Sequence, residues 1–104
     1  MSWPEKHRMA SYRLAKSADL DFEQIFEYGI DTFGVKTAVS YQNRLLKHFD
    51  ELAKQPLLYQ AVNDVRQGYR RSVCGVHAIY YRIDPEEIVI VRILGRQNPK
   101  SAFL

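Results

Sequence analysis

The chain has 104 residues, a formal net charge of +3, and 46% hydrophobic and 12% aromatic residues. This length fits one domain with a single core, and so modest a charge argues against a dedicated nucleic-acid binder. The lone Cys74 excludes an internal disulfide, and His7, His48 and His77 lack the spacing of metal ligands. No apolar run approaches the roughly 20 residues that cross a bilayer. We therefore expect no metal, no cofactor and no membrane contact.

Residues 1–11 are expected to be a mobile extension before the domain. Their start lacks the apolar stretch of a signal peptide, so the cytoplasm is the expected compartment. Met9 is an alternative to Met1 as the start of translation. The alternating run Tyr12-Arg13-Leu14 predicts a short edge strand where the domain begins.

From Lys16 onward the apolar period becomes helical. Acidic residues, Asp21 among them, lie toward the helix start, where the helix dipole favours negative charge and solvent keeps it hydrated. Gly29 allows close approach of a neighbouring helix, and Gly34 suits a left-handed C-terminal cap. The apolar stripe of this helix comprises Phe22, Ile25, Phe26, Gly29, Ile30 and Phe33.

A second amphipathic helix follows at once and ends before Pro56. Its stripe comprises Ala38, Tyr41, Leu45, Phe49 and Leu52. So short a joint between two amphipathic helices predicts an antiparallel helical hairpin. Residues 57–64 have no clear period and are expected to form a loop.

Three β-forming runs, at residues 69–73, 76–83 and 88–94, complete the domain. The short connections between them force antiparallel pairing. Helices followed by strands predict an α+β fold of two layers, in which the hairpin covers one face of the sheet.

The alternation within these strands predicts their faces. Tyr80, Arg82 and Arg92 are expected to share the face turned away from the helices, which requires an odd-numbered loop at the 83–88 turn. The side chains expected to face the helices are Ile79, Tyr81, Ile83, Val89, Val91 and Ile93.

Two groups of residues are candidates for chemistry. Ser72 and Cys74 lie near His77, as in an activated nucleophile, but no acid is placed to orient the imidazole, so an ordinary structural role is favoured. Any single arginine of the sheet can be a surface ion pair. As a cluster they outnumber the local acids, and guanidinium groups suit an acidic protein segment or an RNA backbone. This cluster comprises Arg66, Arg70, Arg71, Arg82, Arg92 and Arg96.

The order of motifs resembles the ParE toxins of bacterial type II toxin–antitoxin modules, within the RelE/ParE superfamily. The resemblance runs over residues 12–98 and leaves 99–104 as a tail. It is carried by Asp21-Phe22-Glu23-Gln24-Ile25-Phe26-Glu27-Tyr28, Phe33-Gly34, Ala38, Tyr41, Leu45, Leu52, Pro56, Val65-Arg66-Gln67-Gly68-Tyr69-Arg70-Arg71, Gly75-Val76-His77, Tyr80-Tyr81-Arg82-Ile83 and Val91-Arg92-Ile93-Leu94.

The resemblance implies a strand, a helical hairpin and an antiparallel sheet. It also implies a toxin that traps DNA gyrase on cleaved DNA and is held inactive by a ParD-like antitoxin, through which alone it reaches operator DNA. The alternative is a ribosome-dependent mRNA endoribonuclease of the RelE type. This chain departs from the ribonuclease pattern at Ser72, at His77-Ala78 and at Phe103, which stands in the region of a late tyrosine and cannot transfer a proton. A third alternative is an inert module.

The resulting site predictions contain no catalytic residue. The expected target-binding residues are Arg70, Arg71, His77, Arg82, Arg92, Arg96, Gln97 and Asn98. The expected antitoxin-binding residues are Phe26, Ile30, Tyr41, Leu45, Arg66 and Arg82, the four apolar ones being expected to remain exposed.

Overall fold

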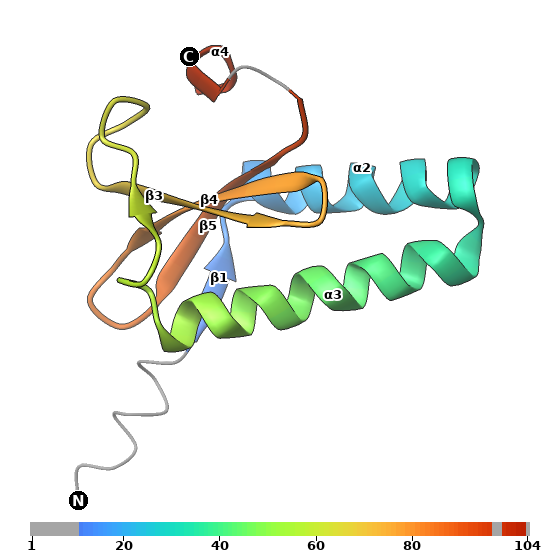
Figure 1. Cartoon of the computed structure of the whole chain (residues 1–104), viewed down its shortest axis with the longest axis horizontal. Coiled ribbons are helices and arrows are strands. Elements are labelled where there is room, and N and C mark those ends of the chain that lie inside the picture. The colour runs from blue at the N-terminus through green and yellow to red at the C-terminus, as the bar shows by residue number, and fades with distance from the viewer. Residues whose placement is uncertain (1–10, 97–98, 104) are drawn as a thin grey trace, which may run out of the picture.

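The computed structural model describes residues 11–96 and 99–103, and Figure 1 shows its elements. The expected extension at residues 1–11 thus lies almost entirely outside the described residues. In chain order the elements are β1 (Tyr12–Leu14), α2 (Lys16–Phe33), α3 (Val35–Lys54), β2 (Gln60–Ala61), β3 (Tyr69–Cys74), β4 (His77–Ile83), β5 (Ile88–Leu94) and α4 (Pro99–Ala102). The predicted order of strand, two helices and three strands is confirmed. The two-residue β2 lies inside the expected loop at 57–64, and α4 lies inside the expected tail.

Two glycines shape the helical hairpin, and Gly34 has the positive φ expected of a glycine cap, although its ψ of 164° lies outside the left-handed helical region. Gly34, between α2 and α3, has a φ of +95°, which other residues rarely adopt, and its N–H donates to the Ile30 carbonyl at 3.0 Å. A Cβ on Gly29 would lie 3.2 Å from the Cβ of Ala38. Because glycine lacks that Cβ, the two helices approach each other closely at this point.

All five strands form one sheet in the order β1-β5-β4-β3-β2. β1 pairs in parallel with β5, and the other neighbours are antiparallel. The sheet is therefore mixed, and the predicted edge strand is confirmed at β1. The main core lies between one face of the sheet and the helical hairpin, which confirms the predicted two-layer α+β fold. No helix in the described part of the chain is long and apolar enough to span a bilayer.

A β-bulge in the β4–β5 pair sets the faces of the two strands. Tyr81 pairs with Ile90, whereas the adjacent Tyr80 pairs with Arg92, so β5 holds one extra residue. This extra residue compensates for a hairpin loop that has an even number of residues. Tyr80, Arg82 and Arg92 therefore share one face as predicted, but the odd-numbered loop that the prediction required is wrong.

The same bulge corrects the predicted inner face of β5. Ile88, Ile90 and Ile93 join the core beneath the helices. Val89 and Val91 belong to a second apolar cluster on the other face of the sheet. The prediction that Val89 and Val91 face the helices is wrong, because the strand changes phase at the bulge, and the prediction for Ile93 is confirmed.

The C-terminal segment covers this second cluster. The Phe103 ring packs edge-on against Tyr69 and Tyr80, with ring centroids 5.4 Å apart in both pairs. Arg66 donates to the Phe103 carbonyl at 2.7 Å. The expected tail therefore contributes, through α4 and Phe103, to the second face of the sheet.

The helical hairpin is longer than the sheet it covers. Figure 1 shows that α2 and α3 continue well beyond the end of the β3–β4 hairpin. Helices of 18 and 20 residues span about 27 and 30 Å. The apolar stripes of both helices thus run on past the last strand residue that could bury them.

Candidate functional site

An apolar groove lies where the helices extend beyond the sheet. It has a volume of about 270 Å³ and is closed at one side by the turn between β3 and β4. Its walls come almost entirely from the apolar stripes of α2 and α3. The lining residues are Phe22, Ile25, Phe26, Tyr28, Gly29, Phe33, Thr37, Ala38, Tyr41, Gln42, Leu45, Val76 and His77.

The rim of the groove is exposed to solvent. Tyr28 is 66% exposed, Phe33 is 64% exposed and Val76 is 79% exposed. A contiguous apolar surface around a groove marks a site for a partner rather than an ordinary solvated surface. The sequence prediction named other apolar residues of the helix stripes as exposed and did not include these three rim residues.

The four apolar residues predicted to bind the antitoxin divide into three groups. Phe26 and Tyr41 line the groove and are half-buried. Ile30 is half-buried on α2 and is not among the lining residues. Leu45 is only 1% exposed and belongs to the core, so its predicted exposure is wrong and it forms only part of the groove floor.

The Tyr41 hydroxyl links α3 to the β3–β4 turn through hydrogen bonds. This hydroxyl lies 3.1 Å from the Cys74 carbonyl and 2.7 Å from Nδ1 of His77, and the Val76 N–H donates to it at 3.3 Å. A Cβ on Gly75, whose φ is +60°, would lie 2.6 Å from the same hydroxyl. Burial raises the pKa of Tyr41, so the hydroxyl stays protonated.

One arrangement of hydrogens satisfies every polar group of the cluster. The Tyr41 hydroxyl has one hydrogen, and donating it to the Cys74 carbonyl leaves its oxygen to accept from Val76 and from His77. That assignment satisfies all four groups and places the imidazole hydrogen on Nδ1 of His77. Burial lowers the pKa of His77, which keeps the ring neutral at pH 7.

Ser72 and Cys74 do not form the nucleophile–base pair with His77 that the sequence raised. Ser72 is buried, and its hydroxyl lies 2.8 Å from Nε2 of His48 on α3. Glu51 lies 3.7 Å from the other nitrogen of that ring. Cys74 is buried, and burial raises the pKa of its thiol. This group of side chains connects α3 to β3.

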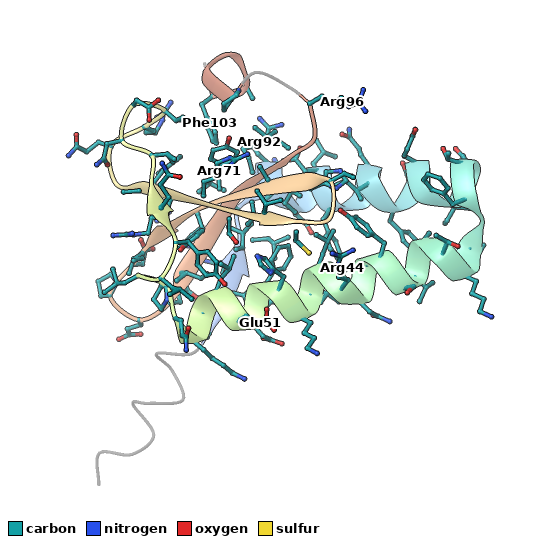
Figure 2. All side chains as sticks on the ribbon, in the orientation of Figure 1. Arg44, Glu51, Arg71, Arg92, Arg96 and Phe103 are labelled. Atoms are coloured by element: carbon teal, nitrogen blue, oxygen red, sulfur yellow. The ribbon has the colours of Figure 1, made fainter. Side chains whose placement is uncertain are left out.

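Five of the six clustered arginines, all except Arg96, have partners among the described residues. Arg82 pairs with Asp84. Arg70 donates to the Tyr59 carbonyl at 2.6 Å, and Arg71 donates to the Tyr80 hydroxyl at 3.2 Å. Arg71 remains an exposed residue. Figure 2 shows Arg71, Arg92 and Phe103 together on the side of the sheet turned away from α3.

Arg92 forms the most buried of these interactions. Its guanidinium donates to both carboxylate oxygens of Asp21, at 2.7 and 3.0 Å, and to the Ala102 carbonyl at 2.8 Å. The Ile93 N–H also donates to Asp21, at 2.9 Å. Arg92 therefore joins α2, β5 and α4, and its guanidinium is committed to the chain rather than presented to a target.

Asp21 corrects the prediction that the acids of the first helix are solvated. It is 8% exposed, and its carboxylate raises the pKa of Arg92. A signal was present in the sequence, because Asp21 lies three residues after Ala18 and four before Ile25, on the apolar stripe. A carboxylate on an apolar stripe requires a buried partner.

A second hollow of about 680 Å³ lies beyond the β3–β4 turn. The exposed Arg96 borders it, and no ion pair joins Arg96 to another described residue. The other two residues predicted for this end of the chain, Gln97 and Asn98, lie outside the described residues. The lining residues are Asp21, Gln24, Ile25, Tyr28, Phe33, Val76, His77, Ile93, Gly95 and Arg96.

The two half-buried histidines predict that acid destabilises the fold. Burial lowers the pKa of His48 and His77 below 6.5, the ordinary value that the unfolded chain retains. Below that pH the unfolded chain binds protons that the folded chain does not, so the free energy of unfolding falls as the pH falls through 6.5 toward the folded-state pKa values. Urea titrations at several pH values between about 7.5 and 5.5 measure the slope of the free energy of unfolding against pH.

A double variant tests the cause of that slope. In His48→Gln with His77→Asn the side-chain amides keep a polar atom near the original nitrogens but do not titrate. We expect its stability to depend less on pH than that of the wild type. Equal slopes in the two proteins would show that other groups cause the acid sensitivity.

Comparisons with known proteins agree with this arrangement. A solved structure titled "Chromosomal ParDE TA system from P. aeruginosa" superposes with a TM-score of 0.74 over 86% of this chain and 99% of that one, at 17% sequence identity. That likeness establishes the fold. A helical hairpin on a mixed sheet, with an open groove at its end, thus defines an α+β protein of the RelE/ParE-like fold.

Sequence comparisons identify the family. The family model described as "ParE toxin of type II toxin-antitoxin system, parDE" matches residues 12–99. Toxin ParE1 of Caulobacter vibrioides is 33% identical over 96 residues, which cover 92% of this chain and 99% of that protein. Toxin ParE1 of Mycobacterium tuberculosis is 32% identical over 87 residues, which cover 83% and 89%. The chain belongs to the ParE toxin family of type II toxin–antitoxin systems.

Proposed function

We propose that this toxin inhibits DNA gyrase and blocks replication in the cytoplasm, and that a cognate ParD-like antitoxin neutralises it. Membership of the ParE family supports the target. The open apolar groove supports the partner, because Tyr28, Phe33 and Val76 leave a surface that a second chain can bury.

The groove favours one mode of antitoxin binding. Its apolar walls suit an amphipathic segment that lies along the helical hairpin and buries one face. Of the sequence-predicted contacts, Phe26 and Tyr41 line its walls and Leu45 forms part of its floor. In this proposal the toxin reaches operator DNA only through the antitoxin, and the toxin–antitoxin pair serves plasmid or chromosome maintenance.

The proposed action is binding to gyrase rather than bond-making by the toxin itself. Phe103, in the region where the ribonuclease branch carries a tyrosine, has no proton to transfer and packs between Tyr69 and Tyr80. Of the predicted target-binding arginines, Arg71 and Arg96 remain exposed. We assign the contact with gyrase to these residues and to the segment after Gly95.

Induction of the chain alone and together with its antitoxin tests the toxin–antitoxin pair. We expect growth arrest in the first case and restored growth in the second. Normal growth of cells that contain folded protein without antitoxin would favour an inert module over an active toxin.

Replacing Arg96 by alanine should separate toxicity from stability. Arg96 is exposed after the last strand, so its loss should leave the melting temperature within about 1–2 °C of the wild type. A charged hydrogen bond lost from the target contact should weaken gyrase binding by about 10- to 100-fold and reduce growth inhibition. Lys54→Ala removes an exposed charge from the far end of α3 and serves as the control. Full toxicity of the Arg96 variant at equal expression would place the target surface elsewhere.

A further inference from the structure

The apolar groove and the second hollow form a continuous surface. They share five lining residues, namely Ile25, Tyr28, Phe33, Val76 and His77. The β3–β4 turn, which Tyr41 holds against α3, stands between them. A segment that leaves the groove over Val76 therefore enters the hollow directly.

The chemistry changes along this path. The groove is lined almost wholly by apolar groups, whereas the hollow adds the polar side chains of Asp21, Gln24 and Arg96. The two carboxylate oxygens of Asp21 are occupied by Arg92 and by the Ile93 N–H. Asp21 is thus neutralised within the chain.

Arg96 is the cation of the hollow that remains available to a ligand. It is exposed, and within the described residues no hydrogen bond or ion pair involves its side chain. A guanidinium matches the planar fork of a carboxylate, and the Gln24 amide supplies a further donor in the same hollow. Charge complementarity therefore favours an acidic side chain as the occupant.

We propose that the second hollow anchors a carboxylate of the antitoxin. In this inference, which rests on the proposed function, the antitoxin segment buries apolar side chains in the groove, crosses Val76 and places one Asp or Glu on Arg96. The antitoxin then covers an arginine that we assign to the gyrase contact. Neutralisation follows from competition for Arg96 as well as from occlusion of the groove.

The probe is a peptide that spans the C-terminal half of the antitoxin. The antitoxin chosen is the one that relieves the growth arrest. The affinity of this peptide is measured by calorimetry for the wild type and for Arg96→Gln, with each acidic residue of the peptide replaced in turn by Asn or Gln. One replacement should weaken binding to the wild type by about 10- to 100-fold and have little effect on Arg96→Gln. Arg13→Gln is the matched control, because Arg13 already pairs with Glu87 and lines neither hollow.

Charged substitutions at Val76, whose side chain is exposed, test whether the antitoxin group that binds here is negatively charged. Val76→Glu should weaken binding of the peptide more than Val76→Lys, because only the glutamate repels the incoming carboxylate. Tight binding that is equally insensitive to Arg96→Gln and to the charge at Val76 would overturn the carboxylate anchor and leave the proposed function standing. Failure of any antitoxin to relieve growth arrest would overturn the proposed function, and this inference with it.

Discussion

Asp21→Ala is expected to reduce the free energy of unfolding by about 3 to 5 kcal/mol. The change leaves the Arg92 guanidinium, whose side chain is 22% exposed, without its carboxylate, and leaves the Ile93 N–H without an acceptor. Urea denaturation at pH 7 measures the loss.

Two further variants isolate the cause of this loss. Glu23→Ala removes an exposed acid from the same helix and should change stability by less than about 0.5 kcal/mol. Combining Asp21→Ala with Arg92→Ala should cost less than the sum of the single changes, because no uncompensated charge then remains. A cost below about 1 kcal/mol for Asp21→Ala alone would contradict the proposed buried pair.

Ile90→Ala is expected to destabilise the domain by about 2 to 5 kcal/mol. Ile90 has no exposed surface and lies in the core between the sheet and the helices. Truncation removes apolar contacts and leaves a cavity that rigid neighbouring strands cannot fill.

Ile83→Ala is the matched control for this prediction. Ile83 lies on the adjacent strand, is the same residue type and is 43% exposed, so its truncation should cost less than about 1.5 kcal/mol. Similar losses for the two variants would show that Ile90 is not at the centre of the core.

Local features of the fold could be predicted from the sequence. The helix bounds follow from apolar period and from stops such as Gly34 and Pro56, which act within a few residues of the chain. The strands follow from β-branched and aromatic runs separated by turns. Each of these signals depends only on residues that are neighbours in the sequence. The sequence was therefore sufficient to predict the helices and the strands.

The bulge between β4 and β5 could not be predicted in the same way. The length of the hairpin loop predicts which side chains share a face only if the side chains alternate regularly along both strands. One extra residue in β5 interrupts that alternation. Two valine positions therefore moved to the other face, although the shared face of Arg82 and Arg92 was correct.

The partners of the arginines also depend on contacts distant in sequence. Arg92 is 71 residues from Asp21, and Arg66 is 37 residues from the carbonyl of Phe103. Counting local acids could not find such partners, because one of them is a buried carboxylate and another is a main-chain oxygen. The sequence predicted an exposed apolar surface on the helical hairpin but not its extent, because the groove lies where the helices extend beyond the sheet.

A gyrase assay with the purified toxin tests the central claim most directly. Supercoiling of relaxed plasmid should be inhibited at micromolar toxin, cleaved DNA should accumulate, and addition of the antitoxin should reverse both effects. Gyrase that remains fully active at micromolar toxin would contradict the account. Codon-positioned cuts in translated mRNA, seen by toeprinting with the same preparation, would instead assign the toxin to the ribosome-dependent endoribonucleases.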